Sequence, residues 1–304
     1  MNKILYFDRL TKQMEEESVY GKHALEFLYG ESWISRIFGR ALLPFLVRYP
    51  FFSRFYGACQ SSPLSARKIK PFIEHFGVDV SEFLEPLESF RSFNDFFYRK
   101  LKKEARPIAK GDDVAIIPTD GRYLFYQDIS EADGFIVKGK KFCLKTLLGD
   151  EDLAKIYEGG SMVIARLCPT DYHRFHFPFS GTPGESCLIN GWLSSVNPMA
   201  LKKNVDILTQ NRRFICPIAS MNFGKVLFLE IGATNVGSVY QTYSAKNFYE
   251  KGSEKGYFAF GASALIILFE PGKIVFDSEL LSHSQNHIEV KCLLGQSMGR
   301  VNKS

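Results

Sequence analysis

Four short stretches of this chain carry side chains that could take part in catalysis. They contain, in order, an Asp-Gly turn, two histidines three residues apart, a turn bracketed by glycines, and a serine between two alanines: Asp120, His173 with His176, residues 232–238, and Ser263. A serine hydroxyl becomes a nucleophile when a histidine accepts its proton and a carboxylate orients that histidine. The sequence therefore holds the three residue types of a nucleophilic triad.

Each stretch taken alone also has an ordinary structural explanation. Asp-Gly and serine are common in tight turns, and a histidine is often a hydrogen-bonded core residue. Two histidines three apart could share a metal ion, but zinc needs at least a third protein ligand. No carboxylate or cysteine near His173 and His176 completes a recognisable ligand pattern. We therefore expect no metal site.

Ser263 lies between two segments that are each expected to form a strand. Residues 257–261 alternate aromatic with smaller side chains, as in a pleated strand with one crowded face. Residues 265–269 are all apolar, which predicts a strand buried on both faces. The small neighbours Ala262 and Ala264 let other groups approach the peptide bond before Ser263 closely.

The remaining pattern predicts an α+β protein with a helical N-terminal region, residues 1–107, and a mainly antiparallel β catalytic domain, residues 108–304. Residues 1–20 predict a small strand or hairpin, to which we assign no function. Helices are expected at 66–76, 92–101, 144–157 and 198–209. Short apolar runs separated by glycine turns predict an antiparallel barrel or sandwich. These runs cover 115–118, 122–126, 134–137, 161–167, 214–219, 225–231, 237–242, two within 257–269, 273–276 and 288–294.

The segment 32–73 has the composition of a membrane-surface region. It contains no acidic residue, and its apolar positions recur at helical spacing from Trp33 to Leu46. Pro44 predicts the start of a second helix that continues to Phe55. Aromatic residues flanked by arginines are typical of a helix lying in a membrane interface, although a helix pair packed on its own domain would explain the periodicity equally well. We expect this segment to bind an anionic lipid surface.

Composition limits the other function classes. The chain has 304 residues and a formal net charge of +5, which is too mild to indicate a nucleic-acid partner. No apolar run reaches the length of a membrane-spanning helix, and the first apolar run is too short for a signal-peptide core. The six scattered cysteines predict free thiols in a reducing compartment. We expect a peripheral protein on the cytoplasmic face of the cell membrane.

The order of the four stretches resembles that of the phosphatidylserine decarboxylases, pyruvoyl enzymes that cut themselves immediately before a serine. The patterns P-x-D-G, Y-H-R-x-H-x-P, G-A-x-N-V-G-S and E-x-G-x-F…S occur here in the family's order, within residues 90–300. The F-x-x-F-F-x-R-x-L-K…R-P lead-in also matches, from Phe93 to Pro107. Two residues depart from the family pattern: Ala262 stands in place of glycine and Ala264 in place of threonine.

The resemblance implies that Asp120, His176 and Ser263 form the self-processing triad and that His173 is a second active-site histidine. Arg166 and residues 232–238 are expected to shape the pocket. Cleavage between Ala262 and Ser263 would give a β chain, residues 1–262, and an α chain, residues 263–304. Ser263 would become the pyruvoyl cofactor, with neither metal nor PLP required.

By the same resemblance, the pyruvoyl group would form a Schiff base with phosphatidylserine in the membrane and release phosphatidylethanolamine. The two chains of one precursor are the expected partners, and the family suggests a homodimer. Two alternatives stay open from the residues. A relative that binds acidic phospholipid without maturing would follow from Ala262 and Ala264, whereas a serine hydrolase would use the same triad but lacks the G-x-S-x-G elbow.

Overall fold

The computed structural model of the chain describes residues 4–18, 50–132, 143–196, 200, 206–232, 239–259 and 263–303. Within these ranges the protein is α+β with mostly antiparallel sheets, which confirms the predicted fold class. The helix expected from Trp33 to Leu46 and the strand expected at 134–137 lie outside the described residues. None of the helices in the described ranges is long and apolar enough to span a membrane.

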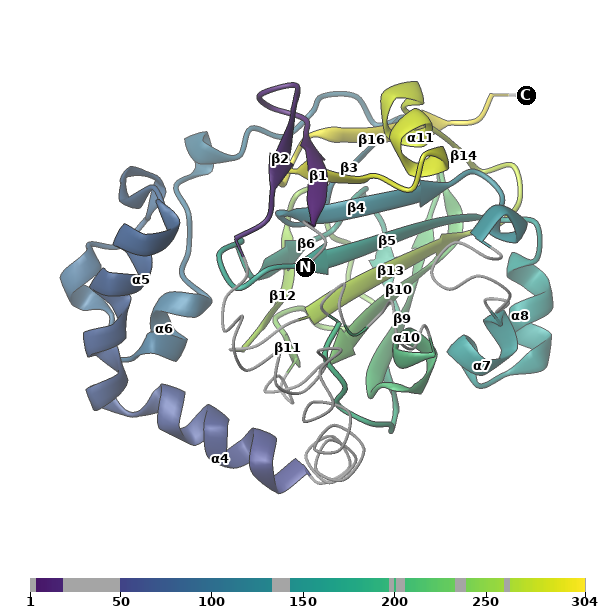
Figure 1. Cartoon of the computed structure of the whole chain (residues 1–304). Coiled ribbons are helices and arrows are strands. Elements are labelled where there is room, and N and C mark those ends of the chain that lie inside the picture. Colours follow the sequence, from purple (N-terminus) through teal and green to yellow (C-terminus); the bar gives the residue numbers. More distant parts are fainter. Residues whose placement is uncertain are drawn as a thin grey trace, which may run out of the picture.

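A helical part lies beside the sheets (Figure 1). Its elements are α4 (Pro50–Ser61), η1 (Pro63–Lys68), α5 (Ile69–Phe76), η2 (Val80–Glu82), η3 (Leu87–Ser89), α6 (Phe93–Phe97) and η4 (Lys103–Ala105). The side chains of Phe93, Phe96 and Phe97 are fully buried in its aromatic core, which confirms that they are core residues. Helix α6 ends four residues before the predicted Leu101 because residues 100–102 pair with residues 82–84 instead.

The largest sheet has ten strands in the order β2-β1-β15-β4-β5-β13-β10-β9-β7, with β8 also paired to β9. The hairpin expected within residues 1–20 forms and joins this sheet through a parallel pairing of β1 with β15. The strands are β1 (Leu5–Asp8), β2 (Gln13–Glu16), β4 (Gly121–Tyr126), β5 (Ser161–Leu167), β7 (Thr182–Pro183), β8 (Cys187–Ile189), β9 (Arg213–Ser220), β10 (Gly224–Gly232), β13 (Ser263–Phe269) and β15 (Glu289–Cys292).

Two smaller sheets and five short helices complete the described structure. One sheet has the order β11-β12-β6 and the other β14-β16-β3. Their bounds are β3 (Val114–Ile116), β6 (Arg174–His176), β11 (Val239–Gln241), β12 (Glu254–Phe258), β14 (Ile274–Phe276) and β16 (Ser297–Val301); the helices are η5 (Ile129–Ala132), α7 (Leu144–Leu148), α8 (Glu151–Tyr157), α10 (Ile207–Gln210) and α11 (Ser278–Gln285). Strand β16 and helix α11 lie in segments for which no element was predicted.

Strand β13 lies near the middle of the large sheet, between β5 and β10. Every one of its residues is buried, as the apolar run predicts. Leu265 and Ile267 pack into one hydrophobic core, whereas Ile266 and Leu268 pack into the core on the other side of the sheet. Ser263 is the first residue of this strand, so the sheet fixes its backbone from both sides.

A fully buried ion pair lies within the core that contains Leu265. The Lys255 ammonium donates to Glu230 Oε1 at 2.5 Å and to Gln241 Oε1 at 3.1 Å. Three aromatic rings lie within 6 Å of the same ammonium: Phe175, Phe228 and Tyr243. Both charged side chains are completely inaccessible to solvent, so each depends on the other for its electrostatic compensation.

We expect Lys255→Met to destabilise the protein by about 3–5 kcal/mol, because it leaves the buried Glu230 carboxylate without its cation. Adding Glu230→Leu should recover most of that loss, since a buried ion pair replaced by apolar side chains of similar size is often neutral. Urea unfolding of both variants checks this, with the exposed Lys273→Met as control. A single Lys255→Met variant as stable as the parent chain would contradict it.

Candidate active site

The Ser263 hydroxyl is buried and has no hydrogen-bond partner among the residues that the structure describes. Burying a hydroxyl without a partner costs free energy, so such groups are rare in folded proteins. Its backbone lies opposite Leu167 on β5 and Gly232 on β10. Ala264 is also buried, opposite Arg166 and Ile231, whereas Ala262 lies outside the described residues.

The small sheet β11-β12-β6 brings the two histidines to the strand that leads toward Ser263. Strand β6 ends at His176, which lies opposite Glu254 on β12. His173 precedes β6, and its carbonyl accepts a hydrogen bond from the backbone of Phe258, the last residue of β12. The chain then continues from Phe258 to Ser263 in five residues.

His173 is fully buried and is held as a neutral imidazole. Its Nδ1 lies 2.9 Å from the carbonyl oxygen of Asp171, and its ring packs on Phe97 with centroids 3.8 Å apart. Because a carbonyl only accepts hydrogen bonds, Nδ1 carries the proton and Nε2 keeps its lone pair. That Nε2 is buried, and no group in the described part of the chain hydrogen-bonds to it. Burial lowers the pKa of His173 to about 3, so the ring is a free base at neutral pH.

His176 is held in the same tautomer by different partners. Its Nδ1 donates to the carbonyl oxygen of Gly252 over 2.9 Å, and its Nε2 lies 3.4 Å from the Tyr172 hydroxyl. Burial lowers the pKa of His176 below its ordinary value, while the nearby charges of Glu254 and Asp120 act in the opposite direction. His176 is therefore also a neutral base, with its Nε2 available to accept a proton.

Asp120 is buried and clamped by Arg106. The guanidinium donates to both carboxylate oxygens, at 2.7 to 3.1 Å, and the backbone N–H of Leu294 donates to Oδ1 at 2.8 Å. Arg106 also pairs with Glu82, so one arginine connects the helical part to the carboxylate. Within the described residues no hydrogen bond joins the side chains of Asp120, His176 and Ser263, and Asp120 acts on His176 only through its charge.

Sequence reasoning missed two arginines that the structure places at this site. Arg106 holds Asp120. Arg99 is buried beside the loop between β5 and β6 (residues 168–173, the histidine loop), where its Nη2 donates to Thr170 O at 3.2 Å. Burial lowers the pKa of Arg99 to about 10, and the rings of Phe83 and Phe96 lie about 5 Å from its guanidinium carbon. Both arginines belong to the R-x-L-K…R-P part of the lead-in motif, so that motif was the sequence signal from which they could have been predicted as site residues.

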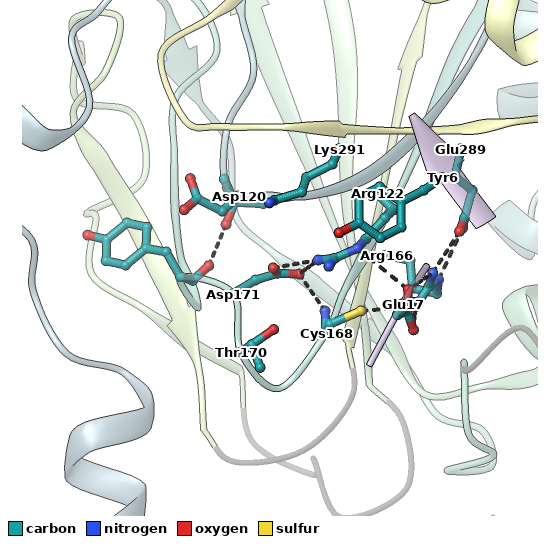
Figure 2. A network of polar contacts seen from close by, with 12 residues as sticks. Tyr6, Glu17, Asp120, Arg122, Arg166, Cys168, Thr170, Asp171, Glu289 and Lys291 are labelled. Carbon is teal, nitrogen blue, oxygen red and sulfur yellow. Dashed lines mark hydrogen bonds and ion pairs between the residues drawn. The ribbon is translucent and has the colours of Figure 1, made fainter. Parts of the chain in front are cut away.

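A second set of buried charges lies next to the histidine loop (Figure 2). Arg122 donates to both carboxylate oxygens of Asp171 at 2.5 Å, and Asp171 accepts from the backbone of Cys168 at 2.7 Å. Arg166 pairs with Glu289 through two hydrogen bonds. Arg166, expected to shape a pocket, is thus a buried ionic residue within the sheet. Within the described ranges there is no group of three or more His, Cys, Asp or Glu residues that could hold a metal ion.

The buried neutral state of His173 predicts a loss of stability in acid. In the unfolded chain this imidazole titrates near its ordinary pKa of about 6.5, whereas the folded chain takes up the proton only near 3. The stability that neutral His173 provides is therefore complete above pH 6.5. Below that pH, the free energy of unfolding falls by about 1.4 kcal/mol for each pH unit.

In His173→Asn we expect the free energy of unfolding to change less steeply between pH 6 and 4, by about 1.4 kcal/mol per pH unit, which corresponds to one proton. The exposed His75→Asn is the control. Urea unfolding at several pH values measures both. An unchanged slope in His173→Asn would show that His173 is not held neutral by the fold.

Comparison with known proteins adds an independent result. The family model described as phosphatidylserine decarboxylase matches residues 93–300. The chain is 47% identical over 300 residues to the phosphatidylserine decarboxylase proenzyme of Chlamydia pneumoniae, covering 99% of this chain and 98% of the relative. It is 48% identical to the proenzyme of Chlamydia caviae, with 99% of each chain covered, and 43% identical to that of Chlamydia trachomatis serovar D, with 98% and 97% covered. The similarity therefore also includes the residues before 93.

Proposed function

Because this chain belongs to the phosphatidylserine decarboxylase family, we propose that it is a proenzyme that cuts itself before Ser263 and then decarboxylates phosphatidylserine. The observation that supports this most directly is the buried, unpartnered Ser263 hydroxyl in the family's processing position. Most buried structural hydroxyls are hydrogen-bonded, whereas a nucleophilic hydroxyl is reserved for the base that takes its proton, and that contact is often long before the reaction begins.

Processing uses the chain's own groups. His176 Nε2 accepts the Ser263 hydroxyl proton, and Asp120 stabilises the resulting imidazolium through its charge. The hydroxyl oxygen attacks the carbonyl carbon of Ala262 and the peptide C–N bond breaks, which leaves an ester and a free amine. Loss of the Ser263 α-proton then breaks the Cβ–Oγ bond and releases the Ala262 carboxylate. Water converts the remaining dehydroalanine to the pyruvoyl group and ammonia.

Ser263 fits this role, because its hydroxyl is unpartnered and its neighbours Ala262 and Ala264 are small. Once formed at Ser263, a pyruvoyl group would supply a carbonyl for condensation with the substrate amine and an acceptor for the electron pair left when CO₂ departs. We assign to His173 the return of a proton to the substrate carbon: its Nε2, which has no partner among the described residues, would first accept the proton that the substrate ammonium loses on condensation and would then donate it to that carbon. Phe97 and the Asp171 carbonyl fix the direction of its ring.

A decarboxylation assay tests this function. Vesicles containing phosphatidylserine labelled at the serine carboxyl should release labelled CO₂ and accumulate phosphatidylethanolamine when the purified protein is added. Reductive trapping with cyanoborohydride should attach the substrate amine to the α chain only. Ester hydrolysis by an uncut chain, without CO₂, would instead support the serine hydrolase alternative.

We also propose that the protein binds peripherally to the cytoplasmic face of the membrane through residues 32–73. Within the described part of that segment, Phe55 and Leu64 are more than 60% exposed, and the cations Arg67 and Lys70 are exposed as well. Exposed apolar groups beside cations suit an anionic lipid surface. Flotation with phosphatidylserine vesicles, compared with phosphatidylcholine vesicles, tests this. The homodimer stays a prediction.

A further inference from the structure

Glu17, which directly follows the β1–β2 hairpin, is buried inside the catalytic half of the molecule. Its side chain is 3% exposed, and its oxygens accept hydrogen bonds from Arg166 at 2.6 and 3.1 Å. One of these oxygens also lies 3.5 Å from Nε of Arg122 (Figure 2). A residue near the start of the chain thus contacts two arginines that are more than 100 positions away in sequence.

Glu17 is a carboxylate that the two arginines share, in addition to Asp171 on Arg122 and Glu289 on Arg166. Arg122 and Arg166 lie directly opposite each other on β4 and β5, and like charges in such a register repel. Arg166 lies in turn opposite Ala264, the residue after Ser263. Glu289 compensates Arg166 only, whereas Glu17 contacts both guanidinium groups. Burial alone would raise the pKa of Glu17, but Arg166 and Arg122 together bring it below its ordinary value, so the carboxylate is ionised at neutral pH.

The contacts continue from Arg122 to His173. Arg122 holds the Asp171 carboxylate, which also accepts from the backbone of Cys168. The Nδ1–H of His173 donates a hydrogen bond to the carbonyl oxygen of Asp171, which sets that ring's tautomer and direction. Movement of Arg122 would therefore shift the backbone that orients His173.

We propose that Glu17 is a positioning residue: by holding Arg122 and Arg166 together, the N-terminal hairpin fixes the loop that presents His173 and the start of strand β13. Glu17 thus acts on the catalytic centre through the two arginines, although it lies far from that centre in sequence. The kinetic consequences of this inference rest on the proposed function. Its structural consequence, the direction of the His173 ring, does not depend on that function.

The test compares Glu17→Gln with Asp8→Asn in the full chain. Asp8 stabilises the same hairpin by pairing with Lys291 at 2.7 Å and by accepting from the backbone of Leu10, but it does not touch either arginine. We expect Glu17→Gln to slow decarboxylation by about tenfold to 100-fold in kcat with little change in KM, since misplacing a reacting group by about 1 Å costs roughly that factor. Asp8→Asn should retain near-normal rates at a similar loss of Tm. Glu17→Asp, which keeps the charge, should restore part of the rate and also serves if Glu17→Gln fails to fold.

A second readout does not depend on activity. In uncut Ser263→Ala chains, the ¹⁵N signals of the His173 ring should shift on adding Glu17→Gln and stay unchanged on adding Asp8→Asn. The inference would be overturned if the ring signals did not shift in Glu17→Gln. It would also be overturned if Asp8→Asn, at the same Tm as Glu17→Gln, slowed catalysis by the same factor as Glu17→Gln. If the parent chain is neither cut nor active, the proposed function fails, while the ring signals still decide the role of Glu17.

Discussion

Ser263→Ala leaves the chain at full length and abolishes decarboxylation, because the same oxygen atom is both the processing nucleophile and the route to the cofactor. The expected loss is complete rather than partial, since no other hydroxyl lies at the start of β13. We also expect this variant to be as stable as the parent precursor, or more stable by about 1 kcal/mol. The alanine removes a buried hydroxyl that has no partner, and such a group carries a desolvation cost. Electrophoresis and a CO₂ assay measure the first effect, and urea unfolding the second.

Ser161→Ala is the matched control. Ser161 is also buried and is the first residue of a central strand, β5, but its hydroxyl bonds to the carbonyl and the side-chain amide of Gln127. Its loss should destabilise the protein by about 1–3 kcal/mol while leaving self-cleavage intact. Self-cleavage or decarboxylation by Ser263→Ala would refute the assignment of Ser263. A large loss of stability in that variant would show instead that the hydroxyl stabilises the fold.

His176→Ala should stop self-cleavage, whereas His173→Ala should be cut and then decarboxylate slowly. Removing a general acid or base typically costs about 10²–10⁴-fold in rate, so each defect is large enough to separate the two steps. The assignment follows the position of each histidine in the family motif. The charges differ in the same sense: Glu254, Arg174 and, more weakly, Asp120 act on His176, whereas Asp171 and Arg99 act on His173. Time courses of chain cleavage and of CO₂ release measure the steps separately.

His75→Ala provides the control, because His75 is exposed on α5 and outside the site. If His173→Ala stayed uncut while His176→Ala was processed normally, the two roles would be exchanged. If both variants were cut at the parent rate, neither histidine would accept the Ser263 proton, and the triad would be wrong.

The strands around the site were predictable because their signal is local. Residues 161–167 and the apolar run after Ser263 coincide with β5 and the interior of β13, since continuous apolar runs require burial on both faces. Strand β16 was missed because it contains a glycine and an arginine, and helix α11 because it is short and polar. Helix α6 was predicted too long because tertiary pairing with residues 82–84 overrides its local propensity.

The candidate site residues were predicted from the order of the motifs, whereas their ionic partners could not be predicted from the sequence. Asp120 and His176 are separated from Ser263 by 143 and 87 positions, so only a family pattern connects them before the fold is known. Arg106 carried a motif signal but no indication that it clamps Asp120. Glu17 carried none, because its partner Arg166 is 149 residues away and a single glutamate after a hairpin is ordinary surface composition.

An intact-mass spectrum of the freshly purified, folded chain tests the central claim most directly. The account predicts two species: residues 1–262, and residues 264–304 carrying a pyruvoyl cap in place of Ser263. Either mass alone locates the cleaved bond, and the cap identifies the cofactor. A single full-length mass would contradict the account and would favour a relative that binds phospholipid without maturing.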